Sequence, residues 1–110
     1  MIYRLYIVAD NRALHDELTQ LPNRRYFMQS YKHQFQIAKR YKKRYSFALV
    51  NIDLDRFKHI NDTYGHEYGD QLLIHVAQRV RDRVRSNDVV ARLGGDEFAI
   101  LLEGITTPQQ

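Results

Sequence analysis

Two acidic segments of the sequence carry residue types that hold metal ions. Asp53-Leu54-Asp55 ends a short apolar run, and Asp96-Glu97 follows a pair of glycines. Because side chains alternate along a strand, Asp53 and Asp55 are expected to point to the same side. Carboxylates this close repel each other, so the pair persists where solvent, a proton or a cation neutralises it. Oxygen ligands in a chain without cysteine favour a hard cation such as Mg²⁺.

The glycines before the second acidic pair indicate a hairpin turn. Gly94 and Gly95 separate two apolar runs, and without a Cβ they let the backbone approach a bulky ligand. If this hairpin lies beside the strand that ends at Asp53, both acidic pairs can share one cation, as in sites that hold a nucleoside triphosphate. An Asp-x-Asp segment alone more often marks a solvated strand end, so the prediction of a site depends on the hairpin.

The segment between the two acidic pairs, residues 56–70, is rich in turn-forming and polar residues and is predicted to be a binding loop. Lys58 can meet a phosphate as a point charge. Asn61 offers a donor and an acceptor, and Asp70 accepts hydrogen bonds, which together suit the edge of guanine. The simpler alternatives are a turn residue at Asn61 and a helix cap at Asp70. The five histidines lack the spacing of metal ligands and are interpreted as surface or packing residues.

Helices and strands that follow one another along the chain are expected to position these side chains. Apolar residues at helical spacing predict helices over residues 23–45 and 70–84. Short apolar runs predict a buried strand over 47–54 and two hairpin strands over 89–93 and 98–102.

Each predicted helix has a candidate cap and an apolar stripe. Asn23 is expected to cap the first helix and Asp70 the second. The first helix is expected to bury Phe27, Tyr31, Phe35, Ile37, Ala38 and Tyr41. The second is expected to bury Leu72, Leu73, Val76, Ala77, Val80 and Val84.

The composition limits the class of protein. With 110 residues and 44% hydrophobic residues, the chain has room for one globular domain. The absence of cysteine excludes disulfides, thiolate zinc sites and cysteine nucleophiles. The longest apolar runs have five residues, against the roughly 20 of a membrane span, so this segment is not expected to cross a membrane.

The net charge of +4 hides an asymmetry between the two halves. Residues 1–50 carry ten basic and three acidic side chains, or +7, and residues 51–110 carry seven and ten, or −3. The basic excess peaks over residues 39–44, at the expected end of a helix, where cations complement the helix dipole. We interpret it as a solvated helix end rather than a surface for nucleic acid, which would show binding that falls steeply with salt.

Residues 1–14 have helical apolar spacing over less than two heptads and can equally begin a strand. We therefore divide the chain into residues 1–15, a linker or signalling helix, and residues 16–110, a partial catalytic domain.

Four ordered motifs between about residues 16 and 103 resemble the GGDEF family of diguanylate cyclases. Chance coincidence of all four in this order is implausible. The motifs are Asp16-Glu17-Leu18-Thr19-Gln20-Leu21-Pro22-Asn23-Arg24-Arg25, Asp53-Leu54-Asp55-Arg56-Phe57-Lys58, Asn61-Asp62-Thr63-Tyr64-Gly65-His66 with Gly69-Asp70, and Arg92-Leu93-Gly94-Gly95-Asp96-Glu97-Phe98.

The resemblance implies an α+β fold in which helices pack on a mostly antiparallel sheet, like that of nucleotide cyclases and polymerase palms. It also implies a cytoplasmic enzyme that joins two GTP molecules into cyclic di-GMP, with Mg²⁺ or Mn²⁺ as cofactor and two domains meeting as a homodimer. Family domains continue through another helix and further strands, so the fold is expected to be incomplete at the C-terminus, with an uncovered sheet edge.

The resemblance further assigns roles to individual residues. It implies that the metal ions are held by Asp53, the backbone carbonyl of Leu54 and Asp96, and that Glu97 assists the attacking 3′-hydroxyl. The remaining substrate contacts that it implies are Asn61 and Asp70 at guanine, and Lys58, Phe57, Gly94 and Gly95 along the rest of GTP.

Two further features qualify this reading. Arg85 and Asp88 fit the Arg-x-x-Asp pattern of a product-inhibition site, where cyclic di-GMP binds. Gln20 stands where the family motif usually has glycine. The alternative function is a catalytically inactive module that binds cyclic di-GMP or GTP.

Overall fold

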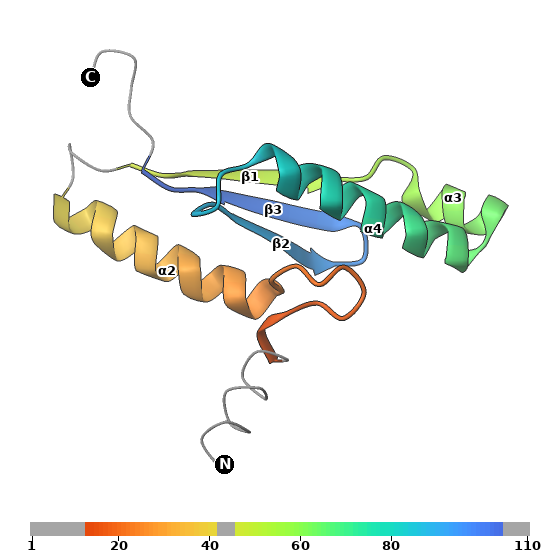
Figure 1. The fold of residues 1–110 in the computed structure, drawn as a ribbon, viewed down its shortest axis with the longest axis horizontal. Coiled ribbons are helices and arrows are strands. Elements are labelled where there is room, and N and C mark those ends of the chain that lie inside the picture. The colour runs from red at the N-terminus through yellow and green to blue at the C-terminus, as the bar shows by residue number, and fades with distance from the viewer. Residues whose placement is uncertain (1–12, 42–45, 105–110) are drawn as a thin grey trace, which may run out of the picture.

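Three antiparallel strands form the sheet of this protein (Figure 1). The computed structural model describes residues 13–41 and 46–104. The strands are β1 (Ala48–Asp53), β2 (Val89–Gly94) and β3 (Glu97–Leu102), in the order β1-β3-β2. The predicted hairpin strands are therefore confirmed, and the central position of β3 places the Gly-Gly turn beside the end of β1.

The first long helix, α2 (Arg24–Tyr41), begins where the sequence predicts. The Tyr26 backbone N–H donates to Asn23 Oδ1 at 3.0 Å, which confirms Asn23 as the cap. Phe27 is buried and packs against the face of the sheet that carries Ala99. The predicted end of this helix near residue 45 falls in a segment outside the described residues.

The apolar stripe predicted for α2 is only partly buried. Phe35 and Tyr41 are 50% and 54% exposed, whereas the polar Gln34 is buried. The 18 residues of α2 span about 27 Å, while a six-residue strand spans about 20 Å, so the helix extends past the strands on which it begins. The prediction of a continuous buried face along α2 was therefore wrong.

Residues 56–70 form helices rather than the predicted binding loop. Helix α3 (Phe57–Tyr64) and helix α4 (His66–Arg83) are joined by Gly65, whose φ of 95° lies in a region that favours glycine. Because α4 begins at His66, Asp70 lies inside the helix and the predicted cap at Asp70 was wrong.

Helix α4 packs on the face of the sheet opposite α2. Leu73 and Ala77 of α4 are buried with Phe98 of β3, whereas Phe27 of α2 packs with Ala99. Adjacent residues of a strand point to opposite faces, so the two helices cover the two faces of the sheet. Figure 1 shows both helices alongside the strands. The predicted α+β class and the stripe of the second helix are confirmed.

Strand β1 is an edge strand and is not buried as predicted. Leu49 and Val50 are 50% and 38% exposed. Within the described residues β1 pairs with β3 alone, and the helices pack chiefly over the other two strands. Leu49 and Val50 are therefore left open to solvent, whereas Ile52 of the same strand packs against the core. No helix in the described ranges is long and apolar enough to cross a membrane.

Candidate functional site

The structure brings the two acidic segments together. Asp53 is paired with Glu97 across β1 and β3, so their side chains lie on the same face of the sheet. The next residue, Leu54, donates its backbone N–H to the Asp96 carbonyl oxygen at 3.3 Å. The end of β1 and the hairpin tip thus form one acidic edge, which we define as Asp53, Asp96 and Glu97.

Asp55 does not share the position that strand alternation predicts. Strand β1 ends at Asp53, and the chain turns at Asp55 and Arg56, whose φ is 58°. The acid that faces Asp53 across the sheet is Glu97 instead. Like charges opposite each other are destabilising. Arg24, at the start of α2, offsets part of this repulsion because its Nη2 lies 3.6 Å from Glu97 Oε1.

The Gly-Gly turn has the backbone geometry that glycine permits. Gly94 and Gly95 have φ of 147° and 49°. The ladder is irregular between Arg92 and Gly94, so the turn follows a bulge. A Cβ on either glycine would meet nothing within 4 Å. The space over the turn is open to a ligand.

Arg92 holds this turn through contacts that sequence reasoning missed. Its Nε and Nη2 donate to the Gly95 carbonyl oxygen at 3.0 and 2.9 Å. Its Nη1 donates to both carboxylate oxygens of Asp16 at 3.1 and 3.2 Å. The Arg92 backbone N–H donates to the Pro22 carbonyl oxygen at 3.0 Å. We call the Asp16–Arg92–Gly95 contacts the turn clamp. Asp16 and Arg92 both belong to motifs recognised in the sequence, but their spacing along the chain does not predict that they touch.

Asp16 is the anionic side of the turn clamp. Its carboxylate also accepts hydrogen bonds from the Thr19 backbone N–H and hydroxyl, both at 2.8 Å. Partial burial acts to raise the pKa of Asp16, but the hydrogen bonds from Thr19 and the charge and hydrogen bonds of Arg92 outweigh it and hold the pKa below its ordinary value. Asp16 is therefore charged at neutral pH and fixes the 16–22 loop to β2.

The residues proposed for guanine lie on two helices that pack against each other. Asn61 lies on α3, and Asp70 lies on α4 directly after the buried Gly69. A Cβ added to Gly69 would lie 1.8 Å from Asn61 Oδ1, so the Asn61 amide occupies the space beside Gly69. Phe57 of α3 packs against the core, while Lys58 is exposed. Asn61 therefore packs against α4 beside the buried Gly69, and Asp70 is exposed at the next position of that helix.

Arg85 and Asp88 contact each other between α4 and β2. The Arg85 Nε and Nη2 donate to the Asp88 carboxylate at 3.3 and 3.1 Å, and the Glu103 backbone N–H donates to it at 3.1 Å. Arg85 also donates to the Glu103 carbonyl. The Asp88 side chain is 2% exposed; this burial acts to raise its pKa, but the hydrogen bonds from Arg85 and Glu103 lower it below its ordinary value. Asp88 therefore fastens this turn to the end of β3.

The donor chemistry of the acidic edge fits a hard divalent cation. Two carboxylates, Asp53 and Asp96, and the Leu54 backbone lie at one end of the sheet. Mg²⁺ commonly takes one or two protein carboxylates and completes its shell with water and phosphate oxygens. Within the described ranges, no group of three or more His, Cys, Asp or Glu side chains forms a ready metal site. These oxygens can therefore supply only part of the shell of such a cation.

A family model described as "Diguanylate cyclase, GGDEF domain" matches residues 13–110. The chain is 53% identical over 91 residues to the bifunctional diguanylate cyclase/cyclic di-GMP phosphodiesterase MucR of Pseudomonas aeruginosa, covering 83% of the chain. The chain belongs to the GGDEF family. Diguanylate cyclase TpbB of the same species is 47% identical over 92 residues, which cover 84% of the chain.

Solved structures of GGDEF domains share this fold. The structure of the coiled coil and GGDEF domain of DgcB from Caulobacter crescentus, in complex with c-di-GMP, matches with a TM-score of 0.89 and 28% identity over 96% of the chain. The GGDEF domain of TpbB has a TM-score of 0.79 and 44% identity over 86% of the chain. This GGDEF chain spans 13% of MucR, 21% of TpbB and about half of the solved DgcB and TpbB chains.

Proposed function

We propose that the protein carrying this GGDEF domain is a diguanylate cyclase that condenses two GTP molecules into cyclic di-GMP. The observation that carries the proposal is the pairing of Asp53 with Glu97 beside the Asp96 carbonyl contact, which joins two distant motifs into one acidic edge. The names of the relatives support the same activity. A cytoplasmic location follows from the proposed substrate, because GTP is a cytoplasmic nucleotide.

In this proposal two regions of the chain bind different parts of GTP. Asn61 and Asp70 read guanine, whose donors and acceptor match a carboxylate and an amide. Asp53, Asp96 and the Leu54 carbonyl hold the metal, and the open space over Gly94 and Gly95 takes the triphosphate. Lys58, which is exposed, supplies a positive charge to a phosphate, and Phe57 supports this region from the core.

The reaction forms one bond and breaks one bond at each α-phosphorus. The 3′-hydroxyl of one GTP attacks the α-phosphorus of the other, and pyrophosphate leaves. Glu97 lies on the acidic edge, where it can accept a hydrogen bond from the hydroxyl and orient it. The bound Mg²⁺ or Mn²⁺ supplies charge neutralisation and lowers the pKa of the hydroxyl. Each domain holds one GTP, so two domains must face each other, which makes the active form a homodimer.

The test is product formation by the full-length protein. Incubation with GTP and Mg²⁺ should yield cyclic di-GMP and pyrophosphate in a ratio of about one to two, which follows from the two displacements. A folded, dimeric sample that yields no cyclic di-GMP would reject the proposal. Asp53→Ala should abolish product formation. Asp55→Ala is its matched control and should retain activity, because Asp55 lies in the turn outside the paired strand and has no proposed metal role.

A second candidate function is a non-catalytic module that binds cyclic di-GMP or GTP. The ordered Arg85–Asp88 pair favours it, because this pair is the proposed inhibitory product site and lies apart in sequence from the acidic edge. Calorimetry separates the two functions. Cyclic di-GMP binding that survives Asp96→Ala and disappears with Arg85→Ala, in a protein without cyclase activity, would support the binding module.

A further inference from the structure

Among the described residues, Arg24 is the cation that forms an ion pair with the acidic edge. Its Nη2 lies 3.6 Å from Glu97 Oε1. Within the same part of the chain, no ion pair engages the side chain of Asp53 or Asp96. The three carboxylates of this edge are therefore not equivalent, because one has a cationic partner and two are left to other ligands.

Arg24 and Glu97 meet because they lie on the same face of the sheet. Phe98, the next residue of β3, packs with α4, so the Glu97 side chain points to the opposite face, which α2 covers. Arg24 is the first residue of α2, where the positive end of the helix dipole also favours a nearby carboxylate. The placement of α2 on the sheet thus directs Arg24 to Glu97.

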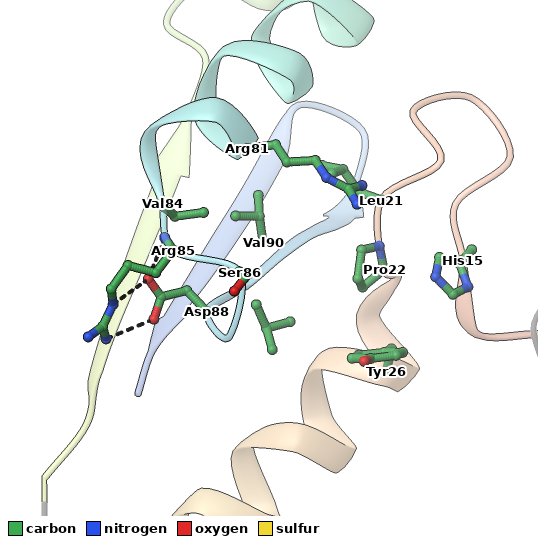
Figure 2. A pocket seen from close by; sticks show the side chains of 11 residues that line it. His15, Leu21, Pro22, Tyr26, Arg81, Val84, Arg85, Ser86, Asp88 and Val90 are labelled. Atoms are coloured by element: carbon green, nitrogen blue, oxygen red, sulfur yellow. Dashed lines mark hydrogen bonds and ion pairs between the residues drawn. The ribbon is translucent and has the colours of Figure 1, made fainter. Parts of the chain in front are cut away.

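The backbone that carries Arg24 is fixed on both sides. Asn23 caps the helix by accepting from the Tyr26 backbone N–H at 3.0 Å. The Pro22 carbonyl oxygen accepts from the Arg92 backbone N–H at 3.0 Å, which joins this segment to β2. Figure 2 shows Pro22 beside the first turn of α2, on which Tyr26 lies. The guanidinium of Arg24 therefore extends from a fixed helix start.

The pair is too exposed to contribute much to the stability of the fold. The side chains of Arg24 and Glu97 are 61% and 38% exposed. Ion pairs of this kind contribute little, because solvent screens the charges and both side chains lose freedom when they pair. The main consequence of the contact is the place at which it holds the Glu97 carboxylate.

The charges of the acidic edge and Arg24 suit one divalent cation. Three carboxylates and one guanidinium give a formal charge of −2, which one such cation balances. While Arg24 contacts Glu97, the carboxylates of Asp53 and Asp96 remain for the cation. This number agrees with Mg²⁺, which is usually bound through one or two protein carboxylates.

We propose that Arg24 is a positioning residue for the cyclase reaction. It holds Glu97 apart from the metal ion, so that this carboxylate stays available to the 3′-hydroxyl. Without Arg24, Glu97 is free to turn toward the cation as a third carboxylate. The inference rests on the proposed function, because that reaction is what gives Glu97 a hydroxyl to orient.

The first measurement is the affinity of the full-length protein for Mn²⁺, by calorimetry without nucleotide. Arg24→Gln should tighten Mn²⁺ binding about two- to tenfold, because it removes a nearby positive charge and releases Glu97. Arg24→Lys should restore the wild-type affinity, since a single contact at 3.6 Å needs the charge rather than the planar fork of arginine. In a Glu97→Gln background the effect of Arg24→Gln should be smaller, because no carboxylate remains to be released.

The second measurement is steady-state turnover at saturating Mg²⁺. Arg24→Gln should lower kcat about tenfold or more and change KM for GTP less than about twofold, because the proposed guanine and metal ligands are untouched. Arg24→Lys should recover most of this loss. The urea midpoint should be the same in all these variants, which separates positioning from a structural role.

Arg25→Gln is the matched control for both measurements. Arg25 is the next residue of α2, is exposed and forms no ion pair within the described ranges. The substitution removes the same charge from the same helix turn. It should change Mn²⁺ affinity and kcat less than about twofold, because solvent and salt screen a charge that makes no contact with the acidic edge.

The proposal is overturned if Arg24→Gln binds Mn²⁺ no more tightly than the wild type does. It is also overturned if the effect on Mn²⁺ affinity is equal with Glu97 and with Gln at that position, or if Arg24→Gln leaves the kcat of an active protein unchanged. A wild-type protein that makes no cyclic di-GMP would instead reject the proposed function. The Mn²⁺ measurements need no turnover, so they test the position of Arg24 separately.

Discussion

Removing the Asp16 carboxylate should destabilise the domain through the turn clamp. Asp16→Ala deletes the acceptors of two hydrogen bonds from Thr19 and of two from Arg92. The Asp16 and Arg92 side chains are 20% and 16% exposed, so the pair lies between the exposed class, about 0–1 kcal/mol, and the buried class, about 3–5 kcal/mol. We expect each single substitution, Asp16→Ala or Arg92→Ala, to cost about 2–3 kcal/mol of unfolding free energy.

A double-mutant cycle measured by urea unfolding isolates the pair itself. The coupling between Asp16→Ala and Arg92→Ala should be about 1–2 kcal/mol, because each single variant leaves the other charge without its partner. Glu17→Ala is the matched control: Glu17 is an exposed neighbour and is expected to change stability by less than about 0.5 kcal/mol. A coupling near zero would show that the clamp geometry does not stabilise the domain.

The pH dependence gives a second measurement on the same pair. The folded-state pKa of Asp16 lies below its ordinary value, so its stabilisation is complete above the unfolded pKa, about 3.9, and is lost as the pH falls through the folded pKa. The stability difference between wild type and Asp16→Asn should therefore shrink as the solution is acidified below about pH 4. A difference that stays constant through this range would refute the charge-based explanation.

Three further substitutions test the acidic edge, the guanine surface and the open strand. Asp53→Ala should abolish cyclase turnover in the full-length protein without lowering stability, because it removes a proposed metal ligand and a like charge opposite Glu97; retained metal-dependent activity would contradict the assignment. Gly69→Ala should displace the Asn61 amide, cost about 1–3 kcal/mol and weaken GTP binding in calorimetry, and in an Asn61→Ala background its stability cost should largely disappear. Leu49→Lys should reduce self-association in sedimentation velocity while changing stability by about 0.5 kcal/mol or less; unchanged association would show that the β1 edge is not the contact.

The sequence predicted the cap of α2 and the hairpin turn correctly, because each depends on residues that are close together in the chain. Asn23 bonds to the first turn of α2 as its residue type indicates. Gly94, which ends β2, and Gly95, which follows it, both have positive φ where the chain turns into β3. The meeting of Asp53 with the hairpin followed from one assumption, that β1 lies beside β3. The sheet order confirms this assumption. The metal ligation inferred from it stays a prediction.

Burial was predicted less well, because the burial of a side chain depends on which helices and strands pack over it. A run of apolar residues reads the same in a central strand and in an edge strand, so Leu49 and Val50 were expected to be buried. Residues 56–70 look like a loop because glycine and asparagine interrupt them, yet Gly65 serves as the junction of two helices and Gly69 provides room for Asn61. These outcomes are set by neighbours that the local pattern does not contain.

The 16–22 loop shows how a local departure from the family pattern is accommodated. Gln20 has a φ of 65°, in the left-handed region, where a residue other than glycine costs roughly 1–2 kcal/mol. Two hydrogen bonds oppose this strain: the Gln20 backbone N–H donates to the Asp16 carbonyl and its Nε2 donates to the Glu17 carbonyl, both at 2.8 Å. The same Asp16 anchors Arg92. The loop that carries the backbone strain is thus fixed to the residue that holds the Gly-Gly turn, so the geometry of the acidic edge depends on a segment far from it in sequence.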